Sequence, residues 1–423
     1  MICIQCSHKK LNKIVNLGNQ VISSLFYSKP KYNLKKYPLD LYKCEKCALV
    51  QLKELAPLDQ MYGSTYGYRT SLSPLMINHI KQKYQNVLKT KVLKKESNIL
   101  DIGCNDGTFL NFFAKQNYNN LYGIDPSALK FKSLHDKKIK LINSFFSKEK
   151  INQKYGQIKF DLITSFAMFY DVSDPNLFCK QIASLLNKNG IWVLELSYWP
   201  MLIENMTYDQ ICHEHIAHYS LTVLKKIIEK NSLKINNFSF NEINGGSIEI
   251  VCSKKESKHK IEKDKISKQI AYESKINHKT YKNLDIRIKN TSTVLKNYLE
   301  NLKKGKNLVI GYGAATKGNI VLNQIGADKN LIPFIADSNP EKYGHYTPGT
   351  NIKIISKKEM RKRKPAYLLV FIWSFRKEVV KQELSFIKKG GKLIFHLPTF
   401  HIIDKNNYKI YLENDFSSFA FKL

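Results

Sequence analysis

One stretch of the chain, residues 98–110, limits the possible folds more than any other, because an apolar strand pattern runs directly into two closely spaced glycines. Gly103 and Gly107 are followed at once by an apolar helix start. Glycine lets a backbone turn tightly and approach a ligand, and the first turn of a helix offers unpaired N–H groups. A second apolar strand ends at Asp125, at the distance of about 20 residues that places a carboxylate beside the ribose of a bound nucleoside. The pattern predicts an α/β, Rossmann-like nucleoside-binding domain.

The spacing of this loop argues against a ligand that carries a diphosphate. From Asp101 the pattern is Asp-x-Gly-x-x-x-Gly, whereas loops that cradle a pyrophosphate follow Gly-x-Gly-x-x-Gly. The segment instead resembles the class I methyltransferases that use S-adenosylmethionine (SAM), which has no phosphates. That resemblance implies a ribose contact, an aromatic side chain against adenine, and a strand at 160–167 that ends near the reacting methyl group. The SAM-binding residues that it implies are Asp101, Gly103, Asn105, Gly107, Asp125, Phe146 and Ser165.

Four of the eight cysteines form two identical pairs near the N-terminus. Cys3 and Cys6 are separated by two residues, and so are Cys44 and Cys47. Each pair can present two thiolates from one turn, and four thiolates make the closed tetrahedral site of a structural zinc ion. The spacing, in a chain without secretory features, favours metal over disulfides. We therefore expect Zn²⁺ on these four residues, holding together a module too small to build its own core.

The composition changes along the chain in four blocks. Residues 1–80 hold the paired cysteines, turns and aromatics, and residues 81–252 alternate apolar strands with amphipathic helices. The lysine-dense block 253–306 carries apolar residues at helical spacing, and 307–423 contains a second strand–helix pattern. We expect a zinc-binding module, a SAM-binding core, a helical connector and a second Rossmann-like domain, in that order.

The formal net charge of +33 raises the possibility of a polyanion partner. However, only five of the 68 basic residues are arginine. Arginine is the residue that usually forms bidentate hydrogen bonds with phosphate and guanine. We therefore expect no nucleic-acid partner, although the positive field would attract an acidic nucleotide-sugar substrate. No apolar run reaches the roughly 20 residues of a membrane span, and no signal-peptide pattern is present. These features predict a cytoplasmic protein without a membrane partner.

A short segment from Cys212 to His215, Cys-His-Glu-His, concentrates titratable side chains. A zinc-protease helix would need a second histidine four residues after His213, where the chain has Ala217. A histidine of ordinary pKa can take up a proton near neutral pH, and Glu214 can orient a neighbouring ring. We interpret the segment as an acid–base site. The alternative is that its histidines are bonded to backbone and are structural.

Taken together, the motifs from Cys3 to about Pro398 make the chain similar to the sugar C-methyltransferase family. Members join a four-cysteine zinc module, a SAM-binding core and a C-terminal Rossmann-like domain, and typically methylate a nucleotide-linked keto-deoxysugar on carbon. The similarity implies that His215 is the base, with Glu214 close by, and that a tyrosine after the zinc module reaches the sugar. The motifs concerned are Cys3/Cys6/Cys44/Cys47, the loop from Asp101, His213-Glu214-His215, Asn244–Ser247, Gly311–Asn319 and Tyr346–Thr350, and the tyrosines are Tyr62, Tyr66 and Tyr68.

The C-terminal block repeats the design of a strand, a glycine loop and a helix, with Gly311, Gly313 and Lys317. As a second nucleotide module it would help to hold the sugar nucleotide, with Asn244 and Tyr68 as further substrate contacts and Lys317 near phosphate. The alternative is a docking domain whose glycines only permit a turn. We expect a monomer or a weak oligomer.

Two positions depart from the family pattern. Cys212 stands where well-known members have tyrosine, and Asp171 stands where they tend to have histidine. These departures leave methylation of oxygen in a sugar open as an alternative. A nucleic-acid methyltransferase and a non-catalytic binding protein are rivals from other classes. Retention of Asp101, Asp125 and His215 argues against the non-catalytic reading.

Overall fold

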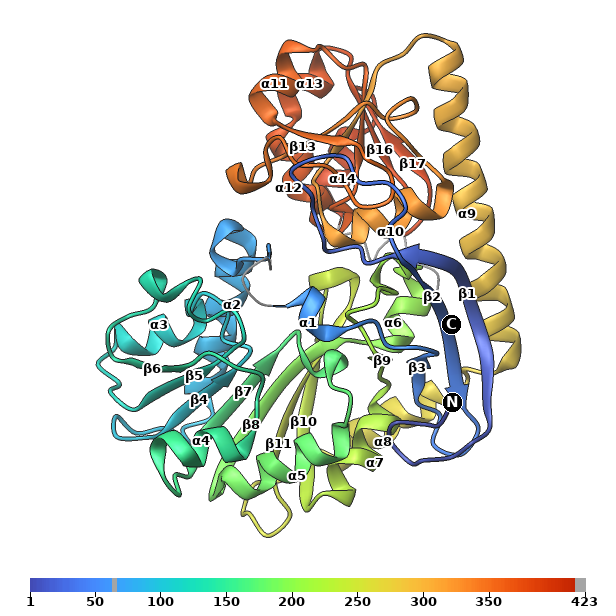
Figure 1. Ribbon diagram of the computed structural model, residues 1–423. Coiled ribbons are helices and arrows are strands. Elements are labelled where there is room, and N and C mark those ends of the chain that lie inside the picture. The colour runs from blue at the N-terminus through green and yellow to red at the C-terminus, as the bar shows by residue number, and fades with distance from the viewer. Residues whose placement is uncertain (63–66, 415–423) are drawn as a thin grey trace.

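The computed structural model describes residues 1–62 and 67–414. Three β-sheets organise these residues, and helices pack around them (Figure 1). The seven-stranded sheet lies at the bottom of the view, the six-stranded sheet at the top, and the four-stranded N-terminal sheet on the right. This arrangement confirms the expected α/β class, with a class I core and a second Rossmann-like domain.

The seven-stranded sheet is built from short apolar runs between amphipathic helices. Every residue of β4 (Ile99–Ile102) and β5 (Leu121–Ile124) is buried, as expected where helices cover both faces of a parallel sheet. The order is β10-β11-β8-β7-β4-β5-β6, and β11 runs antiparallel to both of its neighbours. The other strands are β6 (Ile139–Ile142), β7 (Phe160–Phe166), β8 (Leu186–Ser197), β10 (Leu233–Asn241) and β11 (Ser247–Lys254).

The helices around this sheet begin where the sequence provides caps. Ser73 accepts a hydrogen bond from the backbone of Met76, and Asp174 accepts one from Leu177, each directly before a helix-starting proline. Both features favour a helix N-terminus. The helices are α2 (Pro74–Lys89), α3 (Thr108–Ala114), α4 (Lys148–Tyr155), α5 (Pro175–Leu185), α6 (Trp199–Glu204) and α7 (Leu221–Lys230).

The strand order reverses between β4 and β7, because the chain moves outward from β4 to β6 and then returns to the other side of β4. In open α/β sheets, ligands bind at such a switch point, outside the carboxyl ends of the strands. The loop after β4 carries Gly103, and the loop after β7 carries Met168. The fold therefore places the glycine loop at the position where a ligand is expected.

The N-terminal sheet contains a strand from a distant part of the chain. Its order is β1 (Leu11–Val21), β2 (Lys36–Cys44), β3 (Val50–Leu52) and β9 (Ala217–His218). The short strand β9 follows the His-Glu-His segment and pairs with β3, with Val50 opposite His218 and Gln51 opposite Ala217. The helix α1 (Leu58–Met61) follows β3. The strand that follows the candidate acid–base segment therefore belongs to the sheet of the N-terminal module.

The C-terminal sheet has the order β14-β13-β12-β15-β16-β17, and β17 runs antiparallel to β16. Its first five strands are parallel, and the strand order reverses between β12 and β15. The strands are β12 (Val309–Tyr312), β13 (Phe334–Asp337), β14 (Lys353–Ser356), β15 (Tyr367–Val370), β16 (Lys392–Phe395) and β17 (His401–Ile403). The helices are α10 (Thr316–Ile325), α11 (Lys357–Lys362), α12 (Arg376–Gln382), α13 (Leu384–Lys388) and α14 (Tyr408–Glu413).

Two helices, α8 (Lys263–Glu273) and α9 (His278–Lys304), connect the large sheets. The side chain of Asn277 caps α9, which runs along β1 at the right of Figure 1. The apolar stripe of α9 is buried, which confirms the helix predicted from its spacing; it comprises Leu284, Ile288, Leu295, Leu299 and Leu302. Among the helices of the described ranges, none combines the length and the apolar character that a bilayer crossing requires.

Candidate functional site

The four paired cysteines meet at one end of the N-terminal sheet. Their Sγ atoms all lie within 4.8 Å of one another. The Sγ atoms of Cys3 and Cys47 are 3.4 Å apart, and those of Cys6 and Cys44 are 3.6 Å apart. Zinc–sulfur bonds of about 2.3 Å in a tetrahedron require sulfurs roughly 3.8 Å apart. The quartet therefore fits Zn²⁺.

The backbone explains why each pair converges on one point. Ser7 and Ala48, which directly follow the two pairs, have positive φ values of 57° and 68°. The N–H of Ser7 donates to the carbonyl of Cys3 at 2.9 Å, and that of Ala48 donates to Cys44 at 3.0 Å. The two turns are therefore built alike, and each directs both of its thiols to the same side.

The glycine loop closes the carboxyl end of β4. Gly103 and Gly107 have φ values of 75° and 76°, a region that side-chain-bearing residues rarely adopt. A Cβ on Gly107 would lie 2.5 Å from the ring of His135, so this position needs glycine for space as well as for conformation. The loop leads into α3, where the N–H of Thr108 donates to the side chain of Asp106 at 3.2 Å.

Two buried carboxyl groups fix this loop. Asp125 Oδ2 accepts from the backbone N–H of Asn105 at 3.0 Å, and its Oδ1 accepts from the N–H of Ser127 at 2.6 Å and from its hydroxyl. These bonds use three of the roughly four acceptor positions of a carboxylate. Asp101 accepts from the hydroxyl of Thr164 at 2.6 Å, and burial raises the pKa of Asp101 to about 7. Asp125 is thus held with acceptor capacity for one further donor.

A cavity of about 440 Å³ opens at this switch point; we call it the core cavity. The glycine loop, Asp125 and Phe146 line it. Its described lining holds five carboxyl groups and one lysine, but burial raises the pKa of Asp101 to about 7 and that of Asp171 well above its usual value. These titratable residues are Asp101, Asp106, Asp125, Asp171, Glu195 and Lys317.

Lys317 enters the core cavity from the other Rossmann-like domain, on the first turn of α10. Its Nζ donates to Asn244 Oδ1 at 2.9 Å. Burial lowers the pKa of Lys317, and the nearby carboxylate of Asp209 opposes that shift. Asp209 in turn accepts from the indole N–H of Trp373 at 2.8 Å. Two segments of the C-terminal domain therefore reach the methyltransferase core at this point.

The His-Glu-His segment lies behind the wall of the core cavity, and none of its three side chains is among the described residues that line this cavity. The ring of His215 packs on Tyr170, which lines the cavity, with ring centroids 4.0 Å apart. Burial, followed by electrostatic interaction with His218 and Lys317, lowers the pKa of His215 well below its usual value. His215 is therefore in the neutral form at physiological pH.

Several buried polar atoms in this region have no hydrogen-bond partner among the described residues. They include both carboxylate oxygens of Glu214, Nδ1 of His215, one oxygen of Asp171 and Nε2 of His218. Buried polar groups in proteins are nearly always paired, and an unpaired one is costly. Of the residues that carry these atoms, Asp171 lines the core cavity, whereas Glu214, His215 and His218 lie behind its wall.

A buried network at the end of β8 was not anticipated from the sequence. Glu195 lies 2.7 Å from His79 Nε2, accepts from Asn241 at 2.7 Å and pairs with Lys83. Lys83 also pairs with Glu249 at 2.7 Å. Burial opposes ionisation of Glu195, but His79 and Lys83 keep its pKa below the usual range. The available signal was the i, i+4 spacing of two polar residues, His79 and Lys83, on the buried face of α2.

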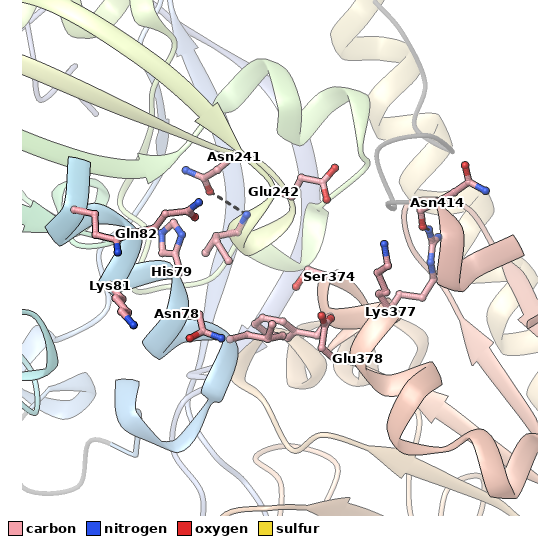
Figure 2. A pocket seen from close by; sticks show the side chains of 15 residues that line it. Asn78, His79, Lys81, Gln82, Asn241, Glu242, Ser374, Lys377, Glu378 and Asn414 are labelled. Carbon is pink, nitrogen blue, oxygen red and sulfur yellow. Dashed lines mark hydrogen bonds between the residues drawn. The ribbon is translucent and has the colours of Figure 1, made fainter. Parts of the chain in front are cut away.

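A second cavity of about 580 Å³ separates α2 from the C-terminal domain (Figure 2). We call it the interdomain cleft. His79 and Ile243 line both this cleft and the core cavity, so the two spaces adjoin. Lys81 and Lys377 lie on opposite sides of the cleft in Figure 2.

Other residues expected at the site lie in varied places. Tyr66 is outside the described residues. Ser165 is turned into the core, where its hydroxyl accepts from Trp192 at 2.9 Å, and it does not line the core cavity. His213 is fully buried against Tyr37, 3.3 Å from its carbonyl oxygen, which matches the structural alternative for that histidine. We therefore retain neither Ser165 as a SAM contact nor His213 as a base.

Tyr68, Asn244 and Phe146 all line the core cavity. Tyr68 belongs to the segment before α2, and its carbonyl accepts from the side chain of Asn105 at 3.2 Å. Phe146 packs on Phe178 with ring centroids 4.8 Å apart. The structure thus brings the expected SAM loop, the expected substrate contacts and Lys317 around one space.

Three family models match consecutive parts of the chain. They are described as a zinc binding domain over residues 3–62, a methyltransferase domain over 76–236 and a C-methyltransferase C-terminal domain over 242–398. Their order follows that of the three sheets. The matched ranges together account for most of the described chain.

Similar proteins include the C-methyltransferase NovU of Streptomyces niveus, 24% identical over 409 residues, which make up 95% of this chain and 96% of that protein. The tRNA U34 carboxymethyltransferase of Campylobacter jejuni is 30% identical over 175 residues, but the match spans 37% of this chain and 57% of that protein. A SAM-dependent methyltransferase structure from Mesorhizobium loti aligns with a TM-score of 0.33 and 12% identity, over 41% of this chain and 99% of that one.

Proposed function

Because this chain is a SAM-dependent methyltransferase of the C-methyltransferase family, we propose that it transfers a methyl group to a carbon atom of a nucleotide-linked keto sugar. The observation that carries the proposal is the set of unpaired buried polar atoms around His215 and Glu214, next to the core cavity. A ligand rich in hydroxyl and carbonyl groups would satisfy them.

SAM, as the methyl-donating substrate, fits the core cavity. The glycine loop from Gly103 to Gly107 lets the backbone approach the methionine part, and Asp125 has acceptor capacity for a ribose hydroxyl. Phe146 offers an aromatic face for adenine at the cavity wall. When bound, SAM supplies an electrophilic methyl group on a cationic sulfur.

The proposed base is His215. A proton next to a ketone must be removed before the carbon can attack, and a neutral histidine can take it. Because its pKa is lowered, His215 is in the neutral form at physiological pH. Glu214, one residue earlier and buried, would orient the sugar or the ring through its unpaired oxygens. The protein then mainly aligns the two substrates.

The adjoining cavities match a substrate with two parts. A sugar placed at His215 would leave its nucleotide to extend past His79 and Ile243 into the interdomain cleft. There, Lys81 and Lys377 would meet its phosphates. Glu242 and Glu378 also line the cleft, so the placement of the two lysines, and not an overall positive charge, is what favours a nucleotide-linked sugar over a free sugar.

Methylation of oxygen is the alternative that follows from Asp171 and Cys212. Asp171 lines the core cavity, and burial raises its pKa well above the usual value, while a hydrogen bond from Tyr62 opposes that shift. A protonated carboxyl there would donate a hydrogen bond to a substrate oxygen. Cys212 does not line the cavity, and neither do His215 and Glu214, so this position does not distinguish the two reactions.

The test is incubation of the purified protein with SAM and a panel of nucleotide sugars, in keto and reduced forms, followed by mass spectrometry. We expect a methylated product from a keto form and none from the reduced form, which has no acidic C–H. A parallel reaction with tRNA and SAM serves as the control, because the tRNA U34 carboxymethyltransferases are the other similar class of protein. Methylation of tRNA without any sugar product would overturn the proposal.

A further inference from the structure

The site needs a group that stabilises the negative charge produced when the proton is removed. Loss of the proton leaves its electron pair on the substrate, and the charge resides largely on the carbonyl oxygen. Preorganised donors or cations at such an oxygen commonly provide the largest contribution to catalysis. Among the described residues that line the core cavity, Lys317 is the one lysine or arginine.

Lys317 is held in place by a polar chain. Its Nζ donates to Asn244 Oδ1, and the carbonyl of Asn244 accepts from the side chain of Gln210. The side-chain oxygen of Gln210 accepts from the hydroxyl of Ser197 at 2.5 Å, at the end of β8. The anchor of Lys317 is therefore tied to the central sheet, which fixes the position of its ammonium group.

The ammonium group of Lys317 has donors to spare. An ammonium carries three N–H groups, and one of them is used by Asn244. Within the described part of the chain, Lys317 makes no ion pair shorter than 4.0 Å, although the carboxylate of Asp209 is near enough to influence it. Two N–H groups therefore remain for a ligand.

The position of Lys317 also separates it from the phosphate groups of a substrate. It lines the core cavity and not the interdomain cleft, whereas Lys81 and Lys377 line the cleft. Its charge is one of the causes that lower the pKa of His215, so the cation lies near the proposed base. A role at the reacting centre fits this location better than a role at the diphosphate.

We propose that Lys317 of the C-terminal domain donates hydrogen bonds to the enolate oxygen of the substrate, so that the active site is assembled from both Rossmann-like domains. This inference rests on the proposed function. His215 takes the proton, the C–H electron pair forms a carbon–carbon double bond, and the carbonyl electrons move to the oxygen beside Lys317. The enolate carbon then forms a bond to the methyl group of SAM while the sulfur–methyl bond breaks, its electron pair stays on sulfur, and the carbonyl is restored. His215 finally releases its proton to water, and S-adenosylhomocysteine leaves.

The experiment compares Lys317→Met with Lys342→Met in the full chain. Lys342 belongs to the same domain and donates to the carbonyl of Ala314 at 2.7 Å, but it lines neither cavity. The measurements are SAM affinity by calorimetry, kcat and KM for the methylated keto sugar, and exchange of the substrate C–H with deuterated water in the presence of S-adenosylhomocysteine.

We expect Lys317→Met to bind SAM normally and to lose roughly 10²–10³-fold in kcat, the usual effect of removing one donor to a developing oxyanion. Its C–H exchange should fall in parallel if the wild type shows exchange, and Lys342→Met should match the wild type. A raised KM with an unchanged kcat would overturn the proposal, because it would mean ordinary substrate binding. Normal exchange with lost methyl transfer would also overturn it.

Failure of the proposed function would look different. In that case the wild type itself would methylate no keto sugar, and the assignment of Lys317 would fall with it. An active wild type with an equally active Lys317→Met would remove the role of Lys317 alone. Retention of part of the activity by Lys317→Arg, which keeps the charge but changes the geometry, would add support.

Discussion

The ammonium nitrogen of Lys317 lies 2.9 Å from the side-chain oxygen of Asn244, although the two residues belong to different Rossmann-like domains. Near them, Trp373 of the C-terminal domain donates to Asp209 of the core at 2.8 Å. The carboxyl edges of the two large sheets therefore face each other across one site. Removal of the C-terminal domain would take away one wall of the site, even if the SAM loop stayed intact.

The first prediction concerns zinc. We expect one zinc ion per chain, and Cys44→Ser should lose it, because four sulfurs complete the tetrahedron. Turnover should fall more than SAM affinity, since β3, just beyond Cys47, pairs with β9, which follows His215. Metal analysis and calorimetry measure both effects. The control Cys252→Ala, a buried cysteine on β11, should keep one zinc. Zinc loss with full turnover would contradict this link.

The second prediction concerns the SAM loop. Asp125→Ala should weaken SAM binding by about one to two orders of magnitude, because charge-assisted hydrogen bonds contribute roughly 1.5–3 kcal/mol each. Asp337 offers a matched control, because it accepts hydrogen bonds from the backbone N–H groups of Ala314 and Asn339 at 2.7 Å. Asp125 holds the glycine loop of the core by the same kind of backbone bonds. Asp337→Ala should leave SAM affinity unchanged by calorimetry. Equal affinities for both variants and the wild type would show that the cofactor lies elsewhere.

The third prediction concerns the base. His215→Ala should bind SAM normally and lose about 10²–10⁴-fold in turnover, the range of general-base contributions. Glu214→Gln should lose less if Glu214 only orients its neighbours. His278, exposed at the first turn of α9, provides the control, and His278→Ala should keep full activity. Near-normal turnover of His215→Ala in a steady-state assay would exclude this assignment.

The fourth prediction is a pH profile. His215 must be neutral to accept a proton, and burial together with His218 and Lys317 lowers its pKa below 6.5. The acid limb that His215 contributes to kcat/KM should therefore lie below pH 6.5. Lys317→Met removes one of the charges that lower this pKa, so its residual acid limb should move to higher pH. An acid limb at or above pH 7 in the wild type would argue for a different base.

The fifth prediction concerns the interdomain cleft. Lys81→Glu places a carboxylate where the diphosphate of the substrate is proposed to lie. Like-charge repulsion should raise KM for the nucleotide sugar, and added salt should reduce the difference from wild type. SAM affinity should not change, because Lys81 does not line the core cavity. An unchanged KM would place the nucleotide elsewhere.

Local patterns in the sequence were sufficient to predict the central strands of the methyltransferase core, the helix α9 and the cysteine quartet. The run before Gly103, the acid at Asp125 and the stripe on α9 each depend on neighbours along the chain, and the structure has them as expected. The pairing of β9 with β3 could not be predicted, because it joins segments more than 160 residues apart.

The direction in which a side chain points was the other feature that the sequence could not predict. Ser165 lies on the strand that leads to the core cavity, but the alternation of that strand turns it toward Trp192. His79 and Glu195 come from a helix and a strand that meet only in the folded chain. Lys317 was recognised as a substrate contact from its motif, but its place in the core cavity depends on the docking of two domains.

The most direct test of the account is the position of the methyl group in the product. The protein is incubated with a nucleotide-linked keto sugar and SAM labelled with ¹³C in its methyl group, and the product is examined by NMR. We predict a labelled methyl bonded to the carbon next to the ketone, absent from the His215→Ala reaction. A labelled methyl on oxygen, or a label transferred equally well by His215→Ala, would contradict C-methylation through an enolate at this site.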